Sequence, residues 1–216
     1  MKKLLFWMVL IVGIVALIGS CAKKDDSKAT TPSTTATSTT TSITTTTPSG
    51  SITLGSYTVS GVYKSGCYTS NLSALIAAKQ FPTDVQSYGF AFVVTGNDNF
   101  TTETHSYTDT GCTTSSWVNK LVRDNVTVGT ASGSNYPVTY NDQTKALTVH
   151  TTAAETTTET LYSNTLDWTV GTPRVLSQSG QFKYGLWTLS GTTWYEGSDS
   201  TSATPTSAGT VPYVKQ

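Results

Sequence analysis

Apolar and polar side chains alternate along much of the chain after residue 51, a spacing typical of β-strands that bury one face. Phe90, Phe92 and Val94 form one such run, and Phe100 begins the next. The residues between them, 96–99, are Gly-Asn-Asp-Asn, which favour a tight turn. This pattern predicts a β-hairpin.

The same signature predicts a second hairpin further along. Val138 and Tyr140 lead into the turn-like residues 141–144, after which Leu147 and Val149 resume the alternation.

A third hairpin is predicted from residues 182–189 and 192–195. If its loop is the two residues 190–191, Trp187 and Trp194 lie directly opposite each other on one face.

Val126 and Val128 mark another strand. Asp124 and Asn125 come just before it, and their residue types fit either a turn or a bulge.

One segment departs from the period of two. Leu72, Leu75 and Ile76 share one helical face, and Pro82 ends the segment, so a short helix is expected near residues 72–80. A helix this short needs to pack on or plug a sheet. The Thr-rich residues 153–160 are expected to form a loop or an edge.

These elements predict a mainly β domain over residues 51–216, with roughly seven to nine strands. Short antiparallel strands joined by hairpins are typical of an up-and-down barrel or of a β-sandwich. The pattern alone leaves both architectures open.

Three patches resemble lipocalin-like proteins. Gly61-Val62-Tyr63 is similar to the Gly-x-Trp signature of the first lipocalin strand, with Tyr63 in place of the Trp. Residues 107–112, Tyr-Thr-Asp-Thr-Gly-Cys, resemble a segment of bacterial lipocalin-like secreted proteins, and residues 212–216 resemble the end of such chains. The resemblance implies an antiparallel lipocalin-like barrel, with the β-sandwich as the alternative.

Such a barrel implies a central cavity that holds a small apolar ligand. We therefore take Tyr63, Trp187 and Trp194 as candidate ligand-binding residues. In the alternative interpretation, Trp187 and Trp194 are exposed and stack on sugar rings, which makes the domain a glycan-binding or structural module of the envelope.

The N-terminus carries the features of an export signal. Lys2 and Lys3 precede an apolar run over residues 4–18, which is shorter than the roughly 20 residues that span a bilayer. Residues 18–21, Ile-Gly-Ser-Cys, resemble the lipobox of bacterial lipoproteins. The resemblance implies that residues 1–20 are a cleaved signal peptide and that Cys21 is the site of lipid attachment.

The resemblance thus implies a location in the cell envelope, with the protein bound to a membrane through its acyl chains. Because Ala22 and Lys23 follow Cys21, with no Asp, the resemblance favours the outer membrane if the host has two membranes. Residues 21–50 are rich in Ser, Thr and Pro and contain one large apolar side chain, Ile43. They predict a disordered tether with a reach of about 30 Å.

The cysteines divide into two groups. Once Cys21 carries lipid, Cys67 and Cys112 remain as an even pair in an exported domain, which predicts a disulfide between them. No Cys-x-x-Cys or paired His pattern of a metal site accompanies them, and no cofactor motif is present in the sequence.

The amino-acid composition argues against one class of binding partner. The chain of 216 residues has 13 basic and 13 acidic side chains, and charged residues make up 12%, about half the usual share. Threonine takes their place, with 45 residues. Zero net charge without a basic cluster argues against nucleic acid as a partner.

Catalytic motifs are sparse. His105 and Ser106 are neighbours on a predicted strand, so their side chains point to opposite faces and cannot form a triad. Asp109 fits a turn residue that accepts hydrogen bonds from nearby amides, and His150 is expected to face solvent. We therefore predict a binding protein rather than an enzyme.

Overall fold

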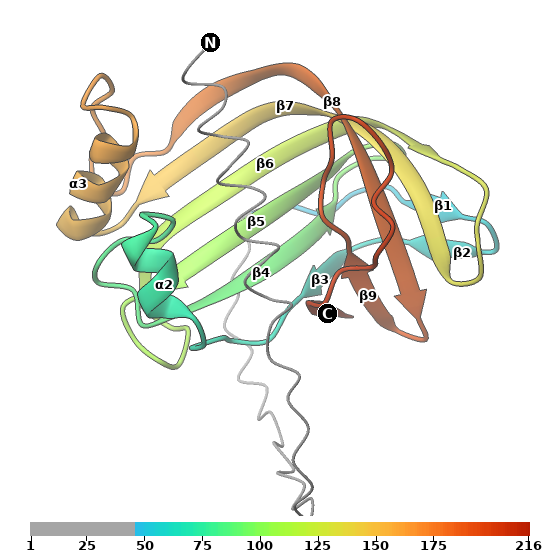
Figure 1. Cartoon of the computed structure of the whole chain (residues 1–216), viewed down its shortest axis with the longest axis horizontal. Coiled ribbons are helices and arrows are strands. Elements are labelled where there is room, and N and C mark those ends of the chain that lie inside the picture. Colours follow the sequence, from blue (N-terminus) through green and yellow to red (C-terminus); the bar gives the residue numbers. More distant parts are fainter. Residues whose placement is uncertain (1–45) are drawn as a thin grey trace, which may run out of the picture. The chain divides into compact units, whose positions relative to one another are not determined.

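The computed structural model describes residues 46–216, and its main element is a closed antiparallel β-barrel of eight strands (Figure 1). The strands are β3 (Val62–Lys64), β4 (Ser87–Val94), β5 (Phe100–Tyr107), β6 (Ser115–Val128), β7 (Asn135–Val149), β8 (Arg174–Ser190), β9 (Thr193–Glu196) and β10 (Pro212–Lys215). Strands β3 to β9 pair in chain order, and β10 closes the barrel between β9 and β3. The predicted lipocalin-like barrel is confirmed, and the sandwich alternative is wrong, because closure leaves one continuous sheet.

A small hairpin outside the barrel sheet lies near one end of it (Figure 1). It consists of β1 (Ile52–Leu54) and β2 (Tyr57–Val59). Ile52, Leu54 and Val59 are buried in the larger apolar cluster of the barrel, together with Phe92, Phe100, Tyr140, Trp187 and Trp194. The hairpin therefore contributes to the core.

Two helices, α2 (Leu72–Ala77) and α3 (Thr152–Leu161), lie at the opposite end (Figure 1). Leu72, Leu75 and Ile76 of α2 pack against a second apolar cluster of the barrel. The helix expected near residues 72–80 is confirmed, although it ends at Ala77.

The expectation of a loop at residues 153–160 is wrong, because α3 forms there. Thr151 provides the N-cap, and its side chain accepts a hydrogen bond of 3.1 Å from the backbone N–H of Ala154. Ala154 and Thr158, one helical turn apart, are both buried. Capping and tertiary packing thus outweigh the low helix propensity of threonine.

The first predicted hairpin is confirmed. Strand β4 pairs with β5 from Ser87 opposite Tyr107 to Val94 opposite Phe100, and the turn lies at the predicted residues.

The second predicted hairpin is wrong. Residues 141–144 continue inside β7, where the register with β8 shifts between Asp142 and Thr144. Asp142 does not turn the chain because its carboxylate has a buried ionic partner, Arg123, inside the barrel. The open question at Asp124 and Asn125 is resolved as a bulge within β6.

The last hairpin is present with a shifted loop. Ser190 pairs with Thr193, so the loop is residues 191–192 rather than 190–191, and Gly191 supplies its positive φ of 60°. The shift places Trp194 opposite Leu189 instead of Trp187. Since the register moves by two residues, both indoles stay on one face, with ring centroids 4.8 Å apart.

The predicted signal peptide, Cys21 and most of the tether lie outside the described residues. Contacts with the barrel begin before the predicted boundary at residue 51, because the backbone N–H of Ser49 donates to the carbonyl of Val94 at 2.9 Å. Within residues 46–216, neither helix is long and apolar enough to cross a membrane.

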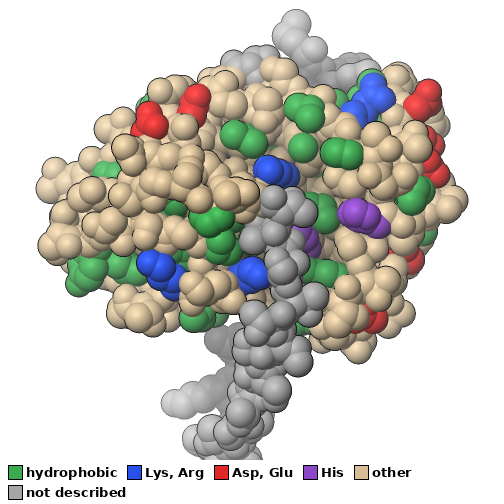
Figure 2. Space-filling view, turned by 180° about the vertical axis from the view of Figure 1, so that it is seen from behind, with side chains coloured by type: hydrophobic (Ala, Val, Ile, Leu, Met, Phe, Trp, Pro, Cys, Tyr) green, Lys and Arg blue, Asp and Glu red, His purple; other side chains and the backbone are tan. Residues whose placement is uncertain are grey.

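Figure 2 shows one face of the molecule, on which uncharged polar side chains and backbone predominate. Outside the grey atoms, basic, acidic and apolar side chains are scattered over this face rather than gathered into a patch. This face therefore offers no charged or apolar patch, whereas charged side chains do cluster around Arg123 within the barrel.

Candidate functional site

A cavity of about 280 Å³ is formed by side chains of the barrel and is more open to solvent than enclosed. It is bounded by β4, β5, β6, β9, β10 and the residues that follow β9. Aromatic and polar side chains line it, among them Phe90, Thr104, Arg123, Glu196, Asp199 and Tyr213. Its volume lies just below the range of about 300–1,000 Å³ that is usual for small-molecule sites, so it suits only a small ligand.

Arg123 of β6 is the central charge of the site. Its side chain is 5% exposed and all three of its nitrogens bond to protein oxygens. Nε donates to Asp142 at 2.9 Å, and Nη1 donates to Glu196 at 2.8 Å and to Thr102 at 3.2 Å. Nη2 donates to Asp199 at 2.5 Å. One guanidinium therefore joins three carboxylates, one from β7 and two from the end of β9 and the residues that follow it.

This ionic network keeps Arg123 charged in a largely dry position. Burial alone lowers the pKa of Arg123, but the carboxylates of Asp199 and Glu196 outweigh it and raise that pKa overall. The guanidinium carbon also lies 5.0 Å from the ring centre of Tyr140 and 5.4 Å from that of Phe100. Aromatic faces at these distances stabilise a cation further.

The segment after β9 completes the wall through Asp199. The second carboxylate oxygen of Asp199 accepts a hydrogen bond from the hydroxyl of Tyr140. The same segment approaches the backbone closely further along, because a Cβ added to Gly209 would lie 1.8 Å from the carbonyl oxygen of Glu196. Only glycine allows the chain to pass there.

Glu196 carries a largely buried carboxyl group of the cavity with a raised pKa. Burial raises its pKa to about 7, against the opposing effect of Arg123 and with the support of negative Asp199. Its side chain is 12% exposed. Oε1 bonds to Arg123, whereas Oε2 has no hydrogen bond to any residue of the described range 46–216.

The three residues predicted to bind ligand lie together, but in the apolar core. Tyr63 is 4% exposed, and Trp187 and Trp194 are fully buried. The ring centroids of Tyr63 and Trp194 are 6.1 Å apart, and none of the three lines the cavity. The exposed indoles that a sugar-stacking surface requires are therefore not provided by Trp187 and Trp194.

The histidines lie away from the cavity. Nε2 of His105 is 2.8 Å from Oε2 of Glu103, and both side chains are buried. Glu103 is itself one of the residues that line the cavity, whereas His105 is not. The side chain of Ser106 is on the opposite face of β5 from that of His105, as predicted. His150 is exposed, also as predicted.

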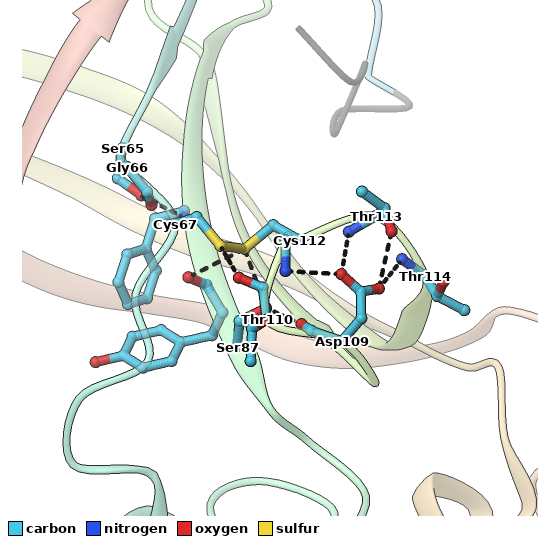
Figure 3. The surroundings of a disulfide bond; sticks show 12 residues. Ser65, Gly66, Cys67, Ser87, Asp109, Thr110, Cys112, Thr113 and Thr114 are labelled. Carbon is cyan, nitrogen blue, oxygen red and sulfur yellow. Dashed lines mark hydrogen bonds between the residues drawn. A yellow bond between two sulfur atoms is a disulfide. The ribbon is translucent and has the colours of Figure 1, made fainter. Parts of the chain in front are cut away.

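The predicted disulfide is confirmed between Cys67 and Cys112, whose Cα atoms are 6.0 Å apart (Figure 3). It joins the segment between β3 and α2 to the β5–β6 loop. Asp109 organises this loop by accepting hydrogen bonds from the amides of Gly111, Thr113 and Thr114. These bonds lower the pKa of Asp109 to about 2, which confirms its predicted role as a turn residue.

Sequence reasoning missed the cavity residues. Arg123 follows a run of strand residues and precedes turn-like ones, so its inward direction depends on a bulge that the sequence leaves open. Asp199 belongs to a Ser- and Thr-rich segment with no periodicity. The one usable signal was the scarcity of charge, since each charged residue of such a chain stands out.

Among residues 46–216, no group of three or more His, Cys, Asp or Glu side chains is arranged to hold a metal ion. The three carboxylates of the cavity do not form such a group because the guanidinium of Arg123 stands between them.

In comparisons with known proteins, no family matches the chain, and no curated protein is significantly similar to it.

Proposed function

We propose that the protein is a lipid-anchored protein of the cell envelope whose barrel binds a small ligand in the cavity beside Arg123. The observation that carries the proposal is the cavity itself, a space of about 280 Å³ beside the buried ionic network of Arg123. Its lining favours a polar ligand over the apolar ligand expected from the lipocalin resemblance.

Export and anchoring are supported by two features of the chain. The tetrad at residues 18–21 resembles a lipobox, so we take Cys21 as the lipidated residue. In a host with two membranes, the residues that follow Cys21 favour the outer membrane as the destination. The disulfide between Cys67 and Cys112 suits an oxidising compartment outside the cytosol. The described residues then form a binding module held near a membrane surface.

Replacing Cys21 by Ala is expected to abolish lipid attachment and to release the protein from membranes. Expression of the full chain in a bacterium with labelled palmitate, followed by membrane fractionation, measures both effects. The variant Cys67→Ala/Cys112→Ala is the control, since it removes the other two thiols and should keep the label. Unchanged labelling and membrane association of Cys21→Ala would refute the anchor.

Filling the cavity is expected to remove a bound ligand. Thr104 lines the cavity from β5, so Thr104→Phe places a phenyl ring inside it. Thr127 is exposed on β6, and Thr127→Phe adds the same ring outside. Native mass spectrometry of protein isolated in mild detergent should show a ligand adduct on the wild type and on Thr127→Phe, and none on Thr104→Phe. An adduct that Thr104→Phe retains, or a wild type without any adduct, contradicts the proposed function.

A further inference from the structure

The charges that line the cavity do not balance. Three acidic residues, Glu103, Glu196 and Asp199, line it against the single guanidinium of Arg123. The carboxylate of Glu103 bonds to His105, so Glu196 and Asp199 are the two that share Arg123. Asp142, on the other side of Arg123, has Lys183 at 3.7 Å as a second partner. The groups around Arg123 therefore carry an excess of about one negative charge when Glu196 and Asp199 are both ionised.

A hydrogen-bond acceptor of the cavity that has no partner in the described part of the protein also favours a ligand with a donor group. Four of the five N–H groups of Arg123 already donate to the protein, which leaves one on Nη2, and both carboxylate oxygens of Asp199 accept bonds, from Arg123 and Tyr140. Oε2 of Glu196 is left as an acceptor with no bond to any residue of the described part. An anionic ligand would meet two carboxylates here, whereas a cationic donor meets a free oxygen.

A second feature independent of the acidic groups indicates a ligand at this position. Tyr213 of β10 is 6% exposed and lines the cavity, yet its hydroxyl has no hydrogen bond to another described residue. The hydroxyl is therefore open to a partner that enters the cavity. Its ring stands 6.5 Å from that of Phe90, so the two rings form an aromatic wall beside the acceptor. Aromatic rings attract organic cations.

We propose that the cavity binds a small organic cation, whose ammonium group bonds to Oε2 of Glu196 and whose apolar part lies against Phe90 and Tyr213. This inference rests on the proposed function and names the class of ligand. It requires no movement of Arg123, because the contacts of Arg123 with Asp142, Glu196 and Asp199 remain in place.

Three probes of similar shape separate charge from fit. They are 2-phenylethylammonium, the neutral 2-phenylethanol and the anionic 3-phenylpropionate, each titrated into the full-length protein after removal of any bound ligand, with calorimetry as the measurement. We expect the ammonium to bind at least about tenfold more tightly than the alcohol, since it forms a charge-assisted bond. The anion should bind most weakly.

Two matched variants test whether the preference for the ammonium probe depends on Glu196. Glu196→Gln removes the charge that faces the ligand and should weaken ammonium binding about tenfold or more, with less than about threefold change for the alcohol. Asp142→Asn removes a carboxylate from the same guanidinium without being part of the cavity lining. It should change ammonium binding by less than about threefold. Both variants leave Arg123 with two carboxylates, so the barrel should fold.

The affinity for the ammonium probe should increase between pH 6 and pH 8. The pKa of Glu196 is raised to about 7, so below that pH a proton occupies the carboxyl and the cation has to displace it. The charged or titratable groups that act on Glu196 are Arg123, Asp142, Asp199, Tyr140 and Tyr213. The probe itself stays protonated over this range. Glu196→Gln should remove the pH dependence.

The outcomes distinguish the inference from the proposed function. If the alcohol binds as tightly as the ammonium, or if Glu196→Gln binds the ammonium unchanged, the cationic ligand is refuted while a ligand-binding cavity stands. If no probe binds the wild type, the cationic ligand is again refuted. In that case the native mass spectrum of Thr104→Phe and its control still decides whether the cavity holds a ligand.

Discussion

Replacing Arg123 by Met is expected to lower the free energy of unfolding by about 3–5 kcal/mol at neutral pH. The guanidinium bonds to Asp142, Glu196 and Asp199, and its side chain is 5% exposed. Without it, three carboxylates stay close together inside the barrel, and Lys183 at 3.7 Å from Asp142 is the nearest remaining cation of the network. The cost comes from leaving these negative charges without their central partner rather than from the loss of a favourable bond.

The destabilisation should depend on pH in a defined direction. Burial already holds the pKa of Glu196 at about 7, above its ordinary value of 4.5, and Arg123 opposes that shift. Removing Arg123 raises the pKa further. When the pKa of a carboxyl is higher in the folded state than in the unfolded state, the free energy of unfolding falls as the pH rises from the unfolded pKa to the folded pKa. Arg123→Met should therefore be more stable at pH 5 than at pH 8, by a larger margin than the wild type.

Urea unfolding at pH 5 and pH 8, followed by tryptophan fluorescence, measures both effects. Arg174→Met is the matched control, because Arg174 is partly exposed, donates to the carbonyl of Asp167 at 2.6 Å and lies 5.3 Å from the ring centre of Trp168. Its loss should cost less than about 1 kcal/mol at either pH. If Arg123→Met loses no more than this control, the network does not stabilise the barrel.

The strands of the barrel were largely predictable because alternation with a period of two is a property of each strand by itself. Phe90, Phe92 and Val94 all point inward, and the Gly-Asn-Asp-Asn turn after them closes a hairpin as its residue types dictate. Closure was not predictable from alternation, because it depends on β10 pairing with both β9 and β3 across most of the domain. The lipocalin resemblance supplied that step.

The candidate site was hidden for a related reason. Asp142 has the residue type of a turn, and only its contact with Arg123, 19 residues earlier, explains why the strand continues through it. Asp199 and Glu196 reach the same guanidinium from more than 70 residues away. Local pattern carries no information about partners so distant in sequence. The aromatic residues that did stand out, Trp187 and Trp194, belong to the core.

Removing the disulfide is the second change with a large expected effect. The bond between Cys67 and Cys112 closes a loop with a sequence separation of 45. Restriction of the unfolded chain by a loop of this length corresponds to about 4 kcal/mol of stability in the chain-entropy description. We therefore expect Cys67→Ser/Cys112→Ser to unfold with about 2–4 kcal/mol less free energy than the oxidised wild type.

The folded structure around the bond should tolerate the change. Cys67 is exposed, and the β5–β6 loop that carries Cys112 is held by other contacts. Asp109 accepts three amide hydrogen bonds within the loop, and its carbonyl accepts a bond of 2.5 Å from the hydroxyl of Ser87 on β4. The loss of stability should consequently arise in the unfolded state, which becomes less restricted.

Urea unfolding of the double variant and of the wild type with and without reductant tests this account. The reduced wild type should match the double variant, because both lack the cross-link. The sulfur atoms, which only the reduced wild type keeps, should make little difference. Both should also show a steeper dependence on urea, since an unrestricted chain exposes more surface. Intact mass under denaturing conditions should fall by about 2 Da on oxidation of the wild type alone, as expected for a single disulfide. Equal midpoints for the oxidised and reduced wild type would show that the bond does not stabilise the barrel.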